Sequence, residues 1–116
     1  MSEVISKELL SDVLGRKCEY KFDDEDEVYY KYWIGSNEHE NKINIHELAY
    51  ECKMKAFQYG YCISLNMYFG HDDEIQGTLI VKDVSNDNIV FDWPLYQKWS
   101  ETEAIFKAFR WILENK

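Results

Sequence analysis

The residues of this sequence that could carry chemistry are three histidines, three cysteines and an excess of carboxylates. His46 and Glu47 match the start of the metalloprotease motif H-E-x-x-H, but the second zinc-ligating position is Tyr50. Glu47 also stands where a glutamate caps the start of a helix, which explains it without a metal. We therefore predict no metal site at this motif.

Two runs of carboxylates stand out as alternative sites. They are Asp23, Asp24, Glu25, Asp26 and Glu27, and then Asp72, Asp73 and Glu74. Such oxygens could hold a divalent ion, but neither run has the glycine and the final glutamate of an EF-hand. Catalytic carboxylate pairs need differing environments, whereas runs are normally solvated. We expect solvated loops, and keep as an alternative a metal-dependent enzyme using the second run.

The cysteines do not form a recognisable reactive pattern. Cys18, Cys52 and Cys62 are odd in number and have no C-x-x-C spacing, so we predict small buried apolar residues in a reducing compartment. Nothing places a histidine beside a cysteine as its base, and no glycine-rich phosphate loop is present. We predict no catalytic residue and no cofactor.

Composition bounds the class of protein and its partners. The 116 residues fit one domain, residues 1–116, and 46% hydrophobic residues exclude general disorder. The net charge of −9 makes direct nucleic-acid binding unfavourable and favours a partner with a basic surface. Without an apolar run long enough for a bilayer or a signal-peptide pattern, we expect no membrane association and a cytoplasmic location in a bacterial host cell.

The clearest element is a helix over residues 100–115. Ser100 and Glu103 form a capping box, and apolar residues follow at helical spacing on one broad face. This face comprises Ala104, Ile105, Phe106, Ala108, Phe109, Ile112 and Leu113. Because such a wide apolar sector cannot remain in water, we expect the helix to cover a sheet.

Seven further elements precede this helix. We predict a short helix capped by Ser2 or Ser6 and ended by Gly15, and a longer one from the Asn44 cap to Gly60. Alternating patterns predict strands over residues 17–22, 28–34, 61–69, 78–84 and 89–93, with a polar loop over 35–41. The first two strands form a hairpin with the first acidic run at its tip.

The predicted fold class is α+β, in the order α-β-β-α-β-β-β-α, with a mainly antiparallel sheet and helices packed on it. The part from Asn44 onward has the α-β-β-β-α order of double-stranded RNA-binding domains. Those domains need basic residues at a helix end, whereas Glu101 and Glu103 bring the opposite charge.

Aromatic residues on the second strand are the other candidate for binding. Tyr29, Lys31 and Trp33 alternate on one side, next to the first acidic run. If the other side faces the core, this side presents aromatic anchors with an acidic rim. The alternative is that a helix layer covers them.

Three stretches resemble one group of proteins: ISKELLSDVLG (Ile5 to Gly15), INIHELAYECKMKAFQYGY (Ile43 to Tyr61) and ETEAIFKAFRWILEN (Glu101 to Asn115). The group consists of small uncharacterised proteins encoded in bacterial prophages and plasmids, and the last two stretches also look like a phage domain described as an α-β-α sandwich. The proline usual between the glutamates of the last motif is missing here. The resemblance implies a mobile-element origin, and its motifs are structural.

The leading hypothesis is a non-enzymatic phage accessory protein that binds a host protein through an acidic surface. An anti-defence inhibitor of the anti-CRISPR kind, occupying a basic nucleic-acid channel, is one concrete version. The contact residues would be the two acidic runs together with Tyr29 and Trp33. The alternatives are a nucleic-acid-binding module on the α-β-β-β-α part and a structural phage component that assembles with itself.

Overall fold

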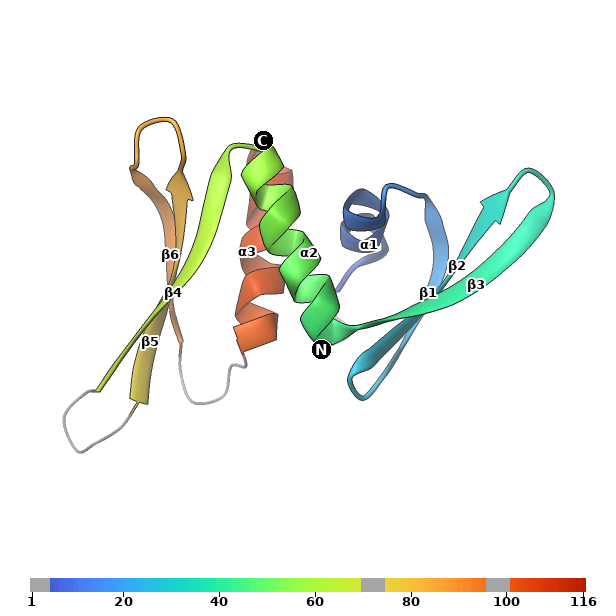
Figure 1. The fold of residues 1–116 in the computed structure, drawn as a ribbon, viewed down its shortest axis with the longest axis horizontal. Coiled ribbons are helices and arrows are strands. Elements are labelled where there is room, and N and C mark those ends of the chain that lie inside the picture. Colours follow the sequence, from blue (N-terminus) through green and yellow to red (C-terminus); the bar gives the residue numbers. More distant parts are fainter. Residues whose placement is uncertain (1–4, 70–74, 96–100) are drawn as a thin grey trace.

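The described part of the chain folds into three helices and two three-stranded sheets, with helices between the sheets (Figure 1). The computed structural model describes residues 5–69, 75–95 and 101–116. The helices are α1 (Lys7–Leu14), α2 (Ile45–Gln58) and α3 (Glu101–Asn115). The strands are β1 (Cys18–Asp24), β2 (Glu27–Ile34), β3 (Asn37–Asn44), β4 (Tyr61–Phe69), β5 (Ile75–Asp83) and β6 (Ile89–Leu95).

Each sheet is an antiparallel meander of consecutive strands. Sheet A has the order β1-β2-β3, and sheet B has the order β4-β5-β6. The element order is therefore α-β-β-β-α-β-β-β-α, an α+β fold as predicted, in which α2, β4, β5, β6 and α3 follow each other in the predicted α-β-β-β-α order. No described helix is long and apolar enough to cross a membrane.

The core lies where the three helices meet the inner faces of the sheets. In α3 the predicted apolar face is buried, with Phe106 and Phe109 fully enclosed. Leu48 of α2, Val28 of sheet A and Leu79 of sheet B are also completely buried and belong to the same cluster. One continuous core therefore joins both sheets, and α3 covers a sheet as expected.

The helix starts follow from local capping. Ser6 accepts a hydrogen bond at 3.1 Å from the Leu9 amide, and Asn44 accepts one at 2.9 Å from the His46 amide. Gly15 ends α1 in the left-handed conformation, with φ of 69°, which a residue without a side chain adopts easily. These predictions are confirmed, whereas the predicted Ser100 cap lies outside the described residues.

The predicted polar loop over residues 35–41 is wrong for most of its length. Strand β3 begins at Asn37 and pairs with β2 along its whole length. Residues 37–42 are exposed on both faces of the sheet, so they show no alternation of apolar and polar residues that would indicate a strand. Strand β6 also continues through Pro94, which an edge strand tolerates because it lacks a neighbour on one side.

Candidate functional site

One face of sheet A carries a row of aromatic side chains that we call the aromatic face. The strand register places Phe22 opposite Tyr29, and Tyr20 opposite Lys31. Trp33 follows two residues after Lys31 and therefore points to the same side. The aromatic face is thus defined by Tyr20, Phe22, Tyr29, Lys31 and Trp33, from two adjacent strands.

These rings remain in contact with water. Tyr20 is 50% exposed, Phe22 is 54% exposed and Trp33 is 53% exposed. The opposite face of the sheet supplies the core instead, with Val28 and Tyr30 buried. The helices therefore pack on one face of sheet A and leave these three side chains of the other face half exposed. This arrangement favours the interpretation of the aromatic face as an interface over its burial under a helix layer.

Lys31 of the aromatic face and Lys42, which lies opposite Tyr29 on β3, already have partners. Lys31 forms an ion pair of 3.3 Å with Glu38 and lies 5.3 Å from the centroid of the Tyr20 ring. The ammonium of Lys42 lies 5.9 Å from the centroid of the Tyr29 ring. Each ammonium group thus restricts the position of a ring by cation–π contact, so the aromatic face is ordered before a partner binds.

The acidic run from residue 23 to residue 27 divides into two parts. Asp23 points to the core side, where both its oxygens lie 3.0 Å from the Lys21 ammonium and both side chains are mostly buried. It is therefore part of the structure and is not offered to a partner, unlike the hypothesis that included the whole run. Asp24, Glu25 and Asp26 are exposed, and Glu27 is partly exposed beside the aromatic face.

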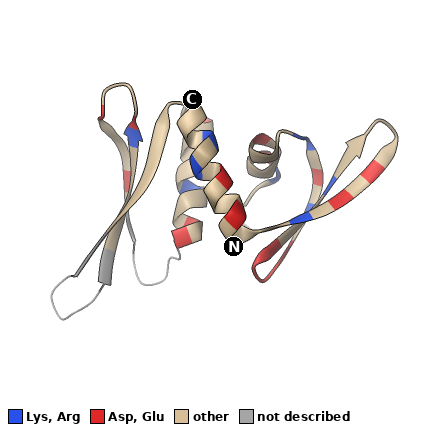
Figure 2. Cartoon of the chain, viewed as in Figure 1, with Lys and Arg blue, Asp and Glu red and all other residues tan. Residues whose placement is uncertain are grey.

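The tip of this hairpin is fixed to the start of α2. The Asp26 carbonyl accepts a hydrogen bond of 2.8 Å from the Ile45 amide, the first of the helix. Negative charge is stabilised there because the helix dipole is positive at its start. Figure 2 shows acidic residues at the β1–β2 turn and at the lower ends of the two central helices. The first turns of these helices contain Glu47 in α2 and Glu101 and Glu103 in α3.

The second acidic run lies outside the described residues, so the structure does not place Asp72, Asp73 or Glu74. The strands that flank this run, β4 and β5, belong to sheet B, which lies on the other side of the helices from sheet A (Figure 1). Within the parts of the chain that are described, no three histidine, cysteine or acidic residues gather as metal ligands.

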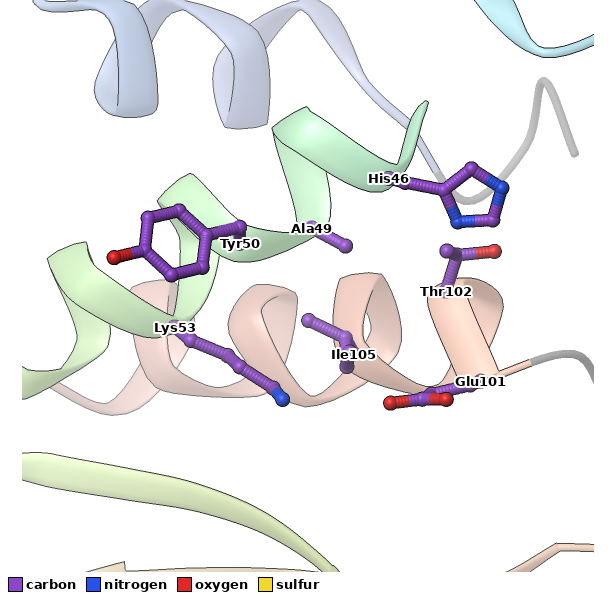
Figure 3. A pocket seen from close by; sticks show the side chains of 7 residues that line it. All are labelled: His46, Ala49, Tyr50, Lys53, Glu101, Thr102 and Ile105. Atoms are coloured by element: carbon purple, nitrogen blue, oxygen red, sulfur yellow. The ribbon is translucent and has the colours of Figure 1, made fainter. Parts of the chain in front are cut away.

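A pocket between α2 and α3 was not predicted from the sequence. It has a volume of about 280 Å³ and a floor formed by Ala49 and Ile105. Figure 3 shows the polar side chains around it: His46, Tyr50 and Lys53 from α2, and Glu101 and Thr102 from α3. His46, Tyr50 and Lys53 are four and three residues apart along α2, so they share one helix face, and this spacing in the sequence could have indicated the pocket. The lining combines a cation, a carboxylate and an imidazole, which suits a polar side chain of a partner.

The thiols offer no nucleophile in the core. Burial raises the pKa of both Cys18 and Cys52, so each stays a neutral thiol, and this agrees with the predicted role as small buried residues. The same prediction is wrong for Cys62, which is exposed on the outer face of sheet B. Cys62 alternates with the buried Ile63, and the sequence did not show which of the two faces the core.

Comparison with known proteins leaves the function to be argued from this geometry. No protein-family model, no curated protein and no solved structure matches the chain. The resemblance to prophage and plasmid proteins therefore stays a prediction.

Proposed function

We propose that the protein is a non-enzymatic binding protein and that its interface is the aromatic face with the adjoining acidic tip. The observation that supports this most is the half exposure of Tyr20, Phe22 and Trp33 on one sheet face, while the core is completed elsewhere. Tyrosine and tryptophan are the residues enriched at the centres of protein interfaces, and acidic residues are found at their rims.

The free energy gained by covering these three rings is enough to support an interface but not to make binding tight. A large aromatic side chain offers about 200 Å² in total, so each of these three leaves about 100 Å² in water. At about 25 cal/mol per Å², covering all three rings contributes roughly 7 kcal/mol. Association itself costs about 4–15 kcal/mol, so the rings require further favourable contacts.

The acidic tip supplies those contacts if the partner is basic. Asp24, Glu25 and Asp26 are exposed, and the whole chain carries a net charge of −9. Opposite charge on a partner accelerates encounter and selects the orientation of docking. We therefore propose a protein partner with a basic surface next to an apolar patch.

The specific version follows the resemblance to prophage proteins. In it the protein is an anti-defence inhibitor, and its acidic tip occupies a basic channel in which a host nuclease holds nucleic acid. The tip is a two-residue turn with Glu25 at φ of 53°, and in this version its exposed carboxylates Asp24, Glu25 and Asp26 contact the basic lining of the channel. This version predicts that nucleic acid and the protein compete for the same partner.

The test is affinity capture from nuclease-treated bacterial lysate with three variants. The first replaces Phe22 and Trp33 by serine, and the second replaces Asp24 and Asp26 by asparagine. The matched control is Phe57→Ser, because Phe57 is 61% exposed on α2, away from sheet A. We expect a bacterial protein that the wild type and the control retain and that both interface variants lose.

The captured protein is then purified and its affinity is measured against salt. Binding through the tip weakens as salt rises, and this dependence is smaller for the Asp24→Asn, Asp26→Asn variant. Equal retention by all variants would contradict the proposal. If binding does not depend on salt and only the serine variant loses it, the aromatic face is still the interface. The proposal that the partner is basic is then wrong.

A further inference from the structure

A second pocket lies between strand β6 and helix α3, on the side of the helices away from sheet A. Its volume is about 260 Å³, and three of its lining residues are aromatic while two are cationic. The complete lining is Phe91, Trp93, Lys107, Arg110, Trp111 and Glu114. This is an unusual local composition for a chain with nine more acidic than basic residues.

The aromatic rings form one connected group. Phe91 stacks on Trp93 with ring centroids 5.8 Å apart, and it contacts Trp111 at 5.5 Å. Trp111 also meets the edge of Tyr61 at 5.9 Å, which ties the group to the core side of sheet B. The rings are therefore held in place by one another, and they are partly exposed, so a flat apolar group can be covered on entering.

The cations of the pocket come from successive turns of α3. The Lys107 ammonium lies 4.9 Å from the centroid of the Trp93 ring, so its position is already restricted by a cation–π contact. Arg110 follows three residues later on the same helix face. Among the described residues that line the pocket, two are cations and one, Glu114, is a carboxylate, so the lining has a formal charge that suits an anionic group.

We propose that this pocket binds a nucleoside monophosphate, with the base against the rings and the phosphate between Lys107 and Arg110. Base stacking on aromatic side chains is tolerant of sequence, and paired Lys and Arg are the usual partners of phosphate. The site is independent of the aromatic face and of any protein partner.

The charge of the whole chain selects a mononucleotide over a strand. A strand brings one phosphate for each nucleotide, and every phosphate outside the pocket meets the field of an acidic protein. A mononucleotide brings one phosphate group, which the two cations can neutralise. Affinity must therefore decrease, or stay constant, as nucleotides are added.

The experiment uses the full chain labelled with ¹⁵N and follows the indole N–H signals during titration. The probes are adenosine monophosphate, adenosine, inorganic phosphate and an adenylate tetranucleotide. We expect the signals of Trp93 and Trp111 to shift in a saturable way with the monophosphate, with adenosine about tenfold weaker. Trp33 on sheet A serves as an internal control and should not shift.

Two variants with the same change in charge complete the test. Lys107→Gln with Arg110→Gln removes the phosphate partners, and Lys17→Gln with Lys82→Gln removes two cations that line neither pocket. We expect about a tenfold loss of monophosphate affinity in the first pair only, with the affinity for adenosine unchanged in both.

Three results would overturn the proposal. The first is the absence of saturable shifts at Trp93 and Trp111 with the monophosphate. The second is an equal loss of affinity in both charge variants, which reports on the net charge alone. The third is an affinity for the tetranucleotide well above that for the monophosphate, which assigns the surface to strands. None of these results bears on the proposed protein partner, which is tested separately.

Discussion

A hydrogen bond between Tyr59 and Asp12 joins α2 to α1, and its removal tests the packing of the helix layer. The Tyr59 hydroxyl donates to Asp12 Oδ2 over 2.6 Å. The other carboxylate oxygen, Oδ1, is buried without a hydrogen-bond partner. Asp12 therefore depends on Tyr59, since the Lys116 ammonium lies 3.5 Å from Oδ2 and its side chain is 39% exposed.

The substitution Tyr59→Phe removes this bond without creating a cavity. The ring of Tyr59 stacks on Phe109 with centroids 6.4 Å apart, and phenylalanine keeps that contact. A hydrogen bond to a charged group contributes about 1.5–3 kcal/mol. Because the Asp12 side chain is 18% exposed and water can partly replace the hydroxyl, we expect the lower end, about 1.5–2 kcal/mol. This corresponds to a decrease in Tm of roughly 6–10 °C.

The assay is urea unfolding at pH 7, followed by tryptophan fluorescence and circular dichroism. Tyr50→Phe is the matched control, because Tyr50 is exposed on the same helix, and its effect should stay within about 0.5 kcal/mol. In a cycle with Asp12→Ala, the two changes should couple by about 1 kcal/mol. A loss below about 0.5 kcal/mol for Tyr59→Phe, or strictly additive changes, would refute the role of this bond.

The same bond gives stability a dependence on alkaline pH. Burial and the hydrogen bond to Asp12 raise the pKa of Tyr59 above its usual value. Folding therefore favours the neutral phenol, and this contribution is complete below about pH 10, where the unfolded tyrosine is also neutral. It is lost as the pH rises above that value, so the wild type should lose stability more steeply than Tyr59→Phe.

Three shorter predictions test other parts of the structure. Asn44→Ala should lower the free energy of unfolding by about 1 kcal/mol, because the His46 amide loses its cap, and this is measured by urea unfolding. Cys62 should react at once with a thiol reagent in the native protein, whereas Cys18 and Cys52 should react only on unfolding; rapid reaction of all three thiols would contradict the burial. Phe22→Ser should lower the free energy of unfolding by about 1 kcal/mol, because only the cross-strand contact with Tyr29 is lost, and a decrease above about 3 kcal/mol would show that the aromatic face is covered.

The helices could be predicted because their signals are local. The buried face of α3 follows from a period of 3.6 residues, and Ser6, Asn44 and Gly15 act within one turn of the helix ends that they cap. Strand β3 could not be predicted, because residues 37–42 contact water on both faces and need no apolar alternation. Its stability comes from pairing with β2, which is a tertiary effect.

The candidate sites, too, could be predicted from the sequence only in part. The alternation of Tyr29, Lys31 and Trp33 was visible in the sequence, but the contribution of Tyr20 and Phe22 depended on the register of β1. The internal ion pair of Asp23 could not be distinguished from the exposed charges beside it, because both lie in one acidic run. The pocket between β6 and α3 joins residues from two elements whose contact no local pattern indicates.

The separation of the aromatic face from the core has an evolutionary consequence. Side chains on that face of sheet A can be exchanged without altering the packing of Val28 and Tyr30 beneath them. If this face is the interface proposed above, its specificity can change while the fold is retained. Half-exposed rings at these positions also promote aggregation unless another surface covers them. We expect homologues that keep Phe22 and Trp33 while their other surface residues differ to bind the same partner.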